Sequence, residues 1–426
     1  MDNISINTQQ SGKMNLNSNR FMYMAIVSFL CMNGIPFLLS LPQQLSNIFK
    51  FIPFICYFCG ILLQKDINKM LQSFLLLIVI LMFDHMLYLA AWVNTVSIFS
   101  KHYSMLSFWF PVLLLLYWKK KLNIKYCKCI IRVFILILTI TSLTTIISLY
   151  IYPLASRELS MATMGKDVIH LYKLNIGSYG FIYGLVSILP FVWNGNIIVK
   201  KRHQILLTTI YTICIIKSNI TLAIIMELAF VMLTIWKRVR SQRIRKGILL
   251  CIISIVTIGF IGFLISGREG ILNLFISISK FKFIANNELL KERVMGVAYV
   301  LTGVNNADDV SSRIMLYRRS ITCFFSSPLI GMLANNTLEF GAHSEILDVF
   351  AATGLVGGSL FIGLIVYSFK QTYFEKTSKY CKKYLPFVGC FAVFSMINTI
   401  FYCPLVMFSL IFVPVIDRIF KELKDV

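Results

Sequence analysis

The chain of 426 residues is 58% hydrophobic and 14% charged, with a mean hydropathy of +0.77. This balance excludes an ordinary soluble globular protein and makes a lipid bilayer the first solvent to consider. A formal net charge of +23 would suit a nucleic-acid-binding protein, but the basic residues form short clusters between apolar stretches. We therefore interpret the charge as a signal of membrane topology and expect no nucleic-acid partner.

The apolar stretches recur at lengths near the roughly 20 residues that a helix needs to cross a bilayer. They predict an all-α polytopic membrane protein with about twelve transmembrane helices. The polar residues 1–20 are expected to form a disordered cytoplasmic tail. The expected spans are 21–41, 48–63, 71–93, 104–118, 130–151, 176–198, 204–216, 219–236, 247–266, 353–369, 384–401 and 403–420.

Lysine and arginine residues indicate the orientation of these spans. If both termini are cytoplasmic, most of the 41 basic residues fall in cytoplasmic segments, as the positive-inside rule requires. Residues 21–266 then hold the first nine spans, with a smaller outer loop at 152–174. A large outer loop at 267–352 follows, and residues 353–426 hold the last three spans and a cytoplasmic tail.

The large outer loop is predicted to contain short helices. Its apolar stretch 271–284 is too short for a further span and is interrupted by two lysines, so we expect an interfacial helix there. A second helix is predicted from Arg313 to Ser326 with Ser312 as its N-cap, and a third begins near Ser344.

Three arginines in the second of these helices could bind phosphate through their planar guanidinium groups. Successive helical residues turn by about 100°, so Arg313, Arg318 and Arg319 cannot all point at one ligand. Arg313 and Tyr317 share a face and are the favoured pair. The plainer interpretation of any single loop arginine is a solvated or lipid-headgroup contact.

His343 lies just before the third predicted helix, where the positive helix end favours a phosphate or sugar pocket. Glu345 and Asp348 are close enough in sequence to orient this histidine or to act as a base. Arg268 is an additional cation of the same loop. A structural histidine is the alternative interpretation.

Three ionisable residues fall inside expected spans: Asp84, His85 and Glu227. Such residues are costly to bury unpaired and are therefore candidates for function. Pairing between helices is the simpler expectation.

Residues 311–358 contain an SR dipeptide followed by an aromatic residue, then PLIGM, then AHSEILDVFAATGLVGG. This segment resembles the O-antigen ligase and polymerase (Wzy-type) superfamily. The family pattern is an arginine before a P-x-x-G turn, then a histidine, a leucine and a G-x-x-G. It is matched here by Arg313, Pro328, Gly331, His343, Ser344, Leu347, Gly354 and Gly357.

The resemblance implies an O-antigen polymerase in the bacterial inner membrane, active on its periplasmic face in lipopolysaccharide biosynthesis. Its substrate would be an undecaprenyl-pyrophosphate-linked oligosaccharide, and its partners the membrane lipids and a chain-length regulator. The implied glycosyl transfer needs no metal and no cofactor. By position, Arg313 would hold the pyrophosphate and His343 would help to activate the acceptor.

The family places a second basic residue in a motif that opens the eighth span. This chain reads KSNIT there, so Lys217 would take that role as a point charge without a fork. Arg157, in the outer loop with Lys166 and Lys173, could supply a further phosphate contact.

Two alternatives remain open at this stage. An O-antigen ligase would use the same chemistry with lipid A core as the acceptor. A secondary transporter or lipid-linked oligosaccharide flippase would instead show an internal repeat and ionisable residues at the bilayer midplane. No repeat is evident in the sequence, but Asp84 and Glu227 keep this class under consideration.

Overall fold

The computed structural model describes the chain in segments. All of its regular elements are helices, and the described residues contain no strand, which confirms the all-α prediction for this part of the chain. The described residues are 2–64, 66–90, 98–118, 124–161, 166–195, 197, 200–239, 247, 254, 257, 269–270, 272–285, 291, 294–296, 298–299, 309–334, 340–341, 343–374, 380–398 and 403–422.

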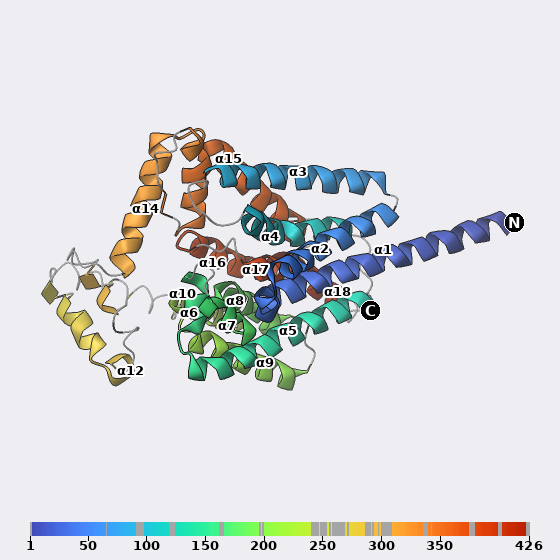
Figure 1. Ribbon diagram of the computed structural model, residues 1–426. Coiled ribbons are helices and arrows are strands. Elements are labelled where there is room, and N and C mark those ends of the chain that lie inside the picture. The colour runs from blue at the N-terminus through green and yellow to red at the C-terminus, as the bar shows by residue number, and fades with distance from the viewer. Residues whose placement is uncertain are drawn as a thin grey trace. The chain divides into compact units, whose positions relative to one another are not determined.

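The chain divides into two compact units, and each is described by itself. Unit 1 comprises Met1–Thr234, Ser359–Ser395 and Ile400–Val426, and unit 2 comprises Ile235–Gly358 and Met396–Thr399. The helices (Figure 1) are α1 (Asp2–Gly34), η1 (Pro36–Ser40), α2 (Gln43–Gln64), α3 (Ile67–Ala90), α4 (Ile98–Trp118), α5 (Ile124–Ile151), α6 (Ala155–Met161), α7 (Lys166–Lys173), α8 (Tyr179–Asn194), α9 (Lys201–Lys217), α10 (Thr221–Arg238), α12 (Lys282–Ala285), α14 (Asp309–Ser326), η2 (Gly331–Leu333), α15 (Glu345–Phe369), η3 (Lys370–Phe374), η5 (Cys381–Tyr384), α16 (Leu385–Ser395), α17 (Pro404–Met407), η6 (Phe408–Phe412) and α18 (Val413–Glu422).

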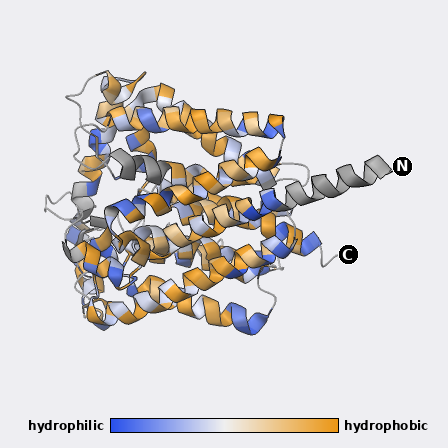
Figure 2. Ribbon diagram, turned by 45° about the vertical axis from the view of Figure 1, so that its right-hand side comes forward, coloured by the Kyte–Doolittle hydropathy of each residue, from blue (hydrophilic) through white to orange (hydrophobic). Residues whose placement is uncertain are grey.

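Within the described parts of the chain, four helical stretches are long and apolar enough to cross a membrane: Gln44–Gln64, Ile67–Ala90, Lys125–Ile151 and Glu345–Phe374. Figure 2 shows that the long helices of unit 1 are hydrophobic along most of their length. Many of these apolar side chains face outward, and Ile147 of α5 is 65% exposed. Exposed apolar surface on helices of this length suits contact with lipid.

Every expected span except the ninth overlaps a helix of the structure. The ninth, 247–266, lies almost wholly outside the described residues. The expectation of a disordered tail differs from the structure, in which α1 begins at Asp2 and includes the polar residues before the first span. The same helix ends at Gly34 and not near residue 41, because Pro36 starts a separate 3₁₀ turn.

Hydrogen bonds tie the helices of unit 1 together at one end. Ser18 Oγ donates to the Gly60 carbonyl at 2.6 Å and also contacts the Tyr117 hydroxyl. Lys69 Nζ donates to the Tyr117 carbonyl at 3.4 Å. The middle of α1, the C-terminal ends of α2 and α4 and the start of α3 therefore meet here.

A second set of hydrogen bonds joins η1, the chain after α7 and the C-terminal half of α5. Asn175 accepts a bond from the Phe37 amide at 3.1 Å, and its carbonyl accepts one from Thr144 Oγ1 at 3.0 Å. The Gly177 amide donates to Thr145 Oγ1 at 2.8 Å. The chain after α7 is thus fixed to the C-terminal half of α5.

Unit 2 contains most of the predicted large loop. Helix α14 begins at Asp309, so Ser312 lies inside the helix; its prediction as the N-cap is wrong. Residues 272–279 are helical, as expected for the apolar stretch of the loop. Helix α15 begins at Glu345 directly after Ser344, as predicted, and non-helical φ and ψ angles at Gly354 interrupt it.

Candidate functional site

In unit 2, Gly331 packs against the segment that leads to Gly354, and Gly354 packs against the segment that leads to Gly331. Gly331 and Gly354 have φ angles of +60° and +63°, which disfavour any side chain. A Cβ atom on Gly331 would lie 2.4 Å from the Ala351 carbonyl oxygen, and one on Gly354 would lie 2.3 Å from the Leu329 carbonyl carbon. Glycine is therefore required at both positions by conformation and by space.

Backbone hydrogen bonds join the same two segments. The Leu355 amide donates to the Pro328 carbonyl at 2.8 Å, and the Val356 amide donates to the Leu329 carbonyl at 3.1 Å. These donors are available because the interruption at Gly354 frees amides that a continuous helix would bond internally. The P-x-x-G and G-x-x-G parts of the motif thus form one structural contact.

A third close approach fixes the segment before α15 against α14. A Cβ atom on Gly341 would lie 2.2 Å from the Leu316 carbonyl oxygen and 2.8 Å from its Cα atom. The Gly341 amide donates to Ser320 Oγ at 2.9 Å. Two residues before His343, the chain therefore rests directly on the backbone of α14.

Asp348 connects this contact to the start of α15. Its carboxylate is buried and accepts hydrogen bonds from Ser320 Oγ at 2.5 Å and from the Ser344 amide at 2.9 Å. Ser344 Oγ in turn accepts a bond from the Leu347 amide at 3.3 Å, the usual role of an N-cap serine. The observed contacts of Asp348 hold the scaffold around His343.

Cys323 lies one turn further along α14 and faces α15. Its Sγ donates to the Ala351 carbonyl at 3.4 Å. Burial raises the pKa of this thiol, and the nearby Asp348 carboxylate raises it further. The thiol therefore stays protonated and serves as a packing residue between the two helices.

These contacts limit the separation between Arg313 and His343. Arg313 lies one turn before Leu316, and His343 lies two residues after Gly341. The separation of their Cα atoms is at most the sum of three lengths: one helical turn from Arg313 to Leu316, the close contact from Leu316 to Gly341, and two residues of chain from Gly341 to His343. This sum is roughly 17 Å. Both side chains are partly exposed.

The remaining predicted residues of α14 have different surroundings. Tyr317 donates a hydrogen bond from its hydroxyl to the Ile397 carbonyl at 2.5 Å. Arg318 and Arg319 are exposed. Arg318 precedes Ser320 by two residues, or about 200° of helical rotation, so it lies on the face turned away from Gly341.

Glu345 occupies the first turn of α15 and is 5% exposed. A carboxylate there interacts favourably with the positive end of the helix. Arg268 lies outside the described residues.

Two predicted phosphate-binding residues belong to unit 1. Lys217 ends α9, is exposed, and holds its Nζ 4.6 Å from the centre of the Tyr150 ring. Arg157 lies in α6, part of a hairpin with α7 that encloses its own apolar cluster of Leu149, Ala155, Leu159, Val168, Leu171 and Ile176. The chain from α6 to α7 is therefore a folded element, and it holds Arg157 near the C-terminal end of α5.

The ionisable residues of the expected spans also lie in unit 1. Glu227 of α10 is buried and accepts a hydrogen bond from Thr212 of α9, which confirms the predicted pairing between helices for this residue. Asp84 is buried in α3, whereas His85 is exposed.

Sequence reasoning overlooked Ser320, the residue that joins α14, Gly341 and Asp348. It lies seven residues after Arg313, so helical periodicity alone places it on the face of Arg313. Its partners could not be identified that way. Among the described residues, no three His, Cys, Asp or Glu side chains are grouped as a metal site would require.

No family model, no curated protein and no solved structure matches the chain.

Proposed function

We propose that the protein is a polysaccharide polymerase of the bacterial inner membrane. It joins undecaprenyl-pyrophosphate-linked repeat units by metal-independent glycosyl transfer on the periplasmic face. The observation that carries the proposal is the contact of Gly341 with the backbone of Leu316. This contact keeps His343 and Arg313, the two residues with the chemistry for the reaction, in one structural unit.

In the proposed reaction, the acceptor hydroxyl oxygen attacks the anomeric carbon of the donor sugar. The bond from that carbon to the pyrophosphate oxygen breaks, and its electron pair leaves with the pyrophosphate. His343 takes the hydroxyl proton, because imidazole accepts protons near neutral pH. Arg313 stabilises the charge that develops on the leaving pyrophosphate, an interaction that is strong near a low-dielectric boundary.

Two sets of contacts in unit 1 support the proposed topology of the first five spans. Ser18, Gly60, Lys69 and Tyr117, which that topology assigns to cytoplasmic ends, bond to one another. Phe37, Thr144 and Asn175, assigned to periplasmic ends, form the other set. A different number of crossings among these helices would place bonded partners on opposite sides of the membrane.

The test is a transfer assay with purified protein, lipid-linked repeat units and EDTA, with products separated by size. Arg313→Ala and His343→Ala should each abolish polymer while single repeats remain. Arg318→Ala is the matched control, because it removes the same charge from the outward face of the same helix, and it should retain polymer formation. Full-length polymer from the Arg313 or His343 variant would refute the proposal.

A second arm of the assay distinguishes a polymerase from a ligase. Lipid A core is added as the acceptor in place of a second repeat unit. Transfer to lipid A core without polymer formation would assign the ligase activity instead.

A further inference from the structure

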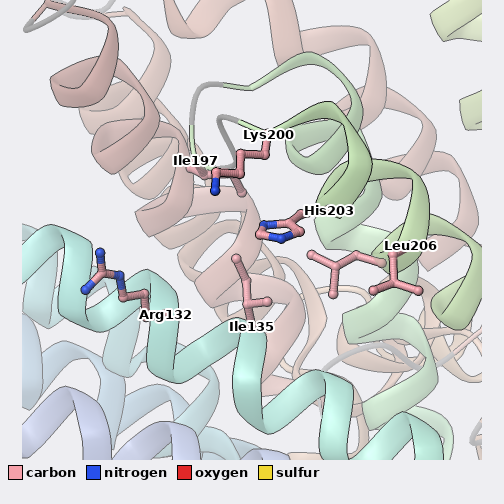
Figure 3. Close-up of a pocket in the computed structure, with 7 residues that line it drawn as sticks. Arg132, Ile135, Ile197, Lys200, His203 and Leu206 are labelled. Carbon is pink, nitrogen blue, oxygen red and sulfur yellow. The ribbon is translucent and has the colours of Figure 1, made fainter.

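A cavity of about 480 Å³ opens in unit 1 between α5 and the start of α9. Figure 3 shows Arg132 and Ile135 on α5, and Lys200 and His203 facing them from the chain that begins α9. The described residues that line it are Arg132, Ile135, Ile197, Lys200, His203, Leu206 and Leu207.

The polar part of this lining suits a phosphate group. Arg132 offers a planar fork of N–H donors, Lys200 a mobile ammonium group and His203 an imidazole. Among the described residues that line the cavity none carries a carboxylate, so none of them would repel an anion. The volume lies within the usual range for bound organic ligands, about 300–1,000 Å³, and exceeds the need of inorganic phosphate.

The apolar part of the lining continues into surface that suits acyl chains. Ile135 and Leu206 lie beside the cations, and both helices extend away from the cavity with exposed apolar residues. Leu136 and Ile140 of α5 are 58% and 50% exposed, and Ile213 of α9 is 41% exposed. A ligand with a phosphate head and hydrocarbon tails matches this succession of cations and apolar surface.

We propose that this cavity binds the phosphate-bearing headgroup of an anionic phospholipid, whose acyl chains lie along α5 and α9. The site is separate from Lys217, the predicted phosphate-binding residue of the same helix. It lies at the first turn of α9, whereas Lys217 ends that helix sixteen residues later, about 24 Å away. In the twelve-span topology the cavity opens at the cytoplasmic leaflet, where anionic headgroups attract basic residues.

Native mass spectrometry of the detergent-purified full chain tests the proposal. The protein is titrated with phosphatidylglycerol, with phosphatidylcholine and with inorganic phosphate, and bound adducts are counted. Arg132→Gln/Lys200→Gln should weaken phosphatidylglycerol binding by about tenfold or more, since each basic residue contributes appreciably to anionic lipid binding. The charge-conserving variant Arg132→Lys/Lys200→Arg should retain most of the binding and shows that the cavity tolerates substitution.

The matched control is Lys128→Gln/Lys201→Gln, which removes two charges from exposed positions of the same helix ends outside the cavity. It should leave phosphatidylglycerol binding within about twofold of the unmodified protein. Equal loss in both double variants would overturn the proposal in favour of general surface attraction. Phosphatidylcholine binding as tightly as phosphatidylglycerol, or displacement by equimolar inorganic phosphate, would also overturn it.

Discussion

Ser320 Oγ lies 2.5 Å from Asp348 Oδ1, in a hydrogen bond that joins residues 28 positions apart. The same serine accepts the Gly341 amide. One hydroxyl therefore connects the helix that carries Arg313, the segment that leads to His343 and the helix that follows it. The stability of this connection should decide whether the candidate site forms.

Replacing Ser320 with Ala removes the donor to a buried carboxylate and the acceptor of a buried amide. Leaving such groups unsatisfied costs about 1–3 kcal/mol, so the free energy of unfolding of unit 2 should fall by that amount. Ser326→Ala, at the exposed end of the same helix, should change it little. Hydrogen exchange at the Gly341 amide measures the effect, and unchanged protection there in Ser320→Ala would contradict the assigned role.

Gly341→Ala should disrupt the contact with α14, because the added Cβ would overlap the Leu316 carbonyl oxygen. Forcing an extra methyl group into a packed site costs about 1–3 kcal/mol. Gly363→Ala is the control, since a Cβ there meets nothing within 4 Å and alanine favours a helix by up to about 1 kcal/mol. In thermal unfolding in detergent, the midpoint of the Gly341→Ala variant should lie below that of the unmodified protein, and the midpoint of the Gly363→Ala variant should lie above it. Equal midpoints for the two variants would show that Gly341 has room for a side chain.

Asp417 of α18 is fully buried and accepts hydrogen bonds from Tyr380 at 2.8 Å and Tyr384 at 2.7 Å. Lys383 Nζ lies 3.5 Å from the same carboxylate oxygen and donates to the Asn194 carbonyl at 3.0 Å. Burial lowers the pKa of Lys383, and the Asp417 carboxylate opposes this shift. The Asp417 carboxylate and its partners therefore join α18, the segment 380–384 and the end of α8.

Asp417→Asn should lower the free energy of unfolding by about 2 kcal/mol, because it leaves the partly buried lysine without its counter-charge. Glu422→Ala removes a carboxylate that is 63% exposed and paired with Arg418, and it should cost about 0.5 kcal/mol or less. Denaturation of the purified protein compares the two. A smaller loss for Asp417→Asn than for Glu422→Ala would be inconsistent with the cluster as described.

Lys217→Gln should raise the KM for lipid-linked substrate about tenfold if this lysine contacts pyrophosphate, as loss of a charged hydrogen bond predicts. Lys217→Arg should retain a low KM, because a guanidinium can stack on Tyr150 and also offer a fork of donors. Lys201→Gln, at the other end of α9, is the control. Equal KM values for the Lys217→Gln and Lys201→Gln variants would show that Lys217 does not bind the substrate. The roles proposed for Arg313 and His343 would not be affected by that result.

The orientation of unit 1 can be tested with a membrane-impermeant maleimide. Lys173→Cys should react from the periplasmic side, and Lys201→Cys only after the inner membrane is permeabilised, because one helix crossing separates them. A Cys129→Ser background removes the exposed cysteine among the described residues. Labelling of Lys201→Cys before permeabilisation would invert the proposed topology.

The helical class and the approximate positions of most helices could be predicted from the sequence. Runs of apolar residues are local, and their length is set directly by the thickness of a bilayer. The start of α15 after Ser344 was predictable for a similar reason, since an N-cap depends on neighbouring residues. The start of α14 was not, because Asp308, Asp309 and Ser312 are all residue types that favour an N-cap, and the local sequence does not choose among them.

The residue types of the candidate site and the shared face of Arg313 and Tyr317 were likewise evident from the sequence, because helical periodicity fixes which side chains lie together on one helix. Only the tertiary structure decided that Gly341 rests on Leu316, that Gly331 packs against the segment interrupted at Gly354, and that Asp348 binds Ser320. These contacts join segments separated by a turn and a loop. Their partners are selected by packing and hydrogen-bond satisfaction in three dimensions, which no local pattern encodes.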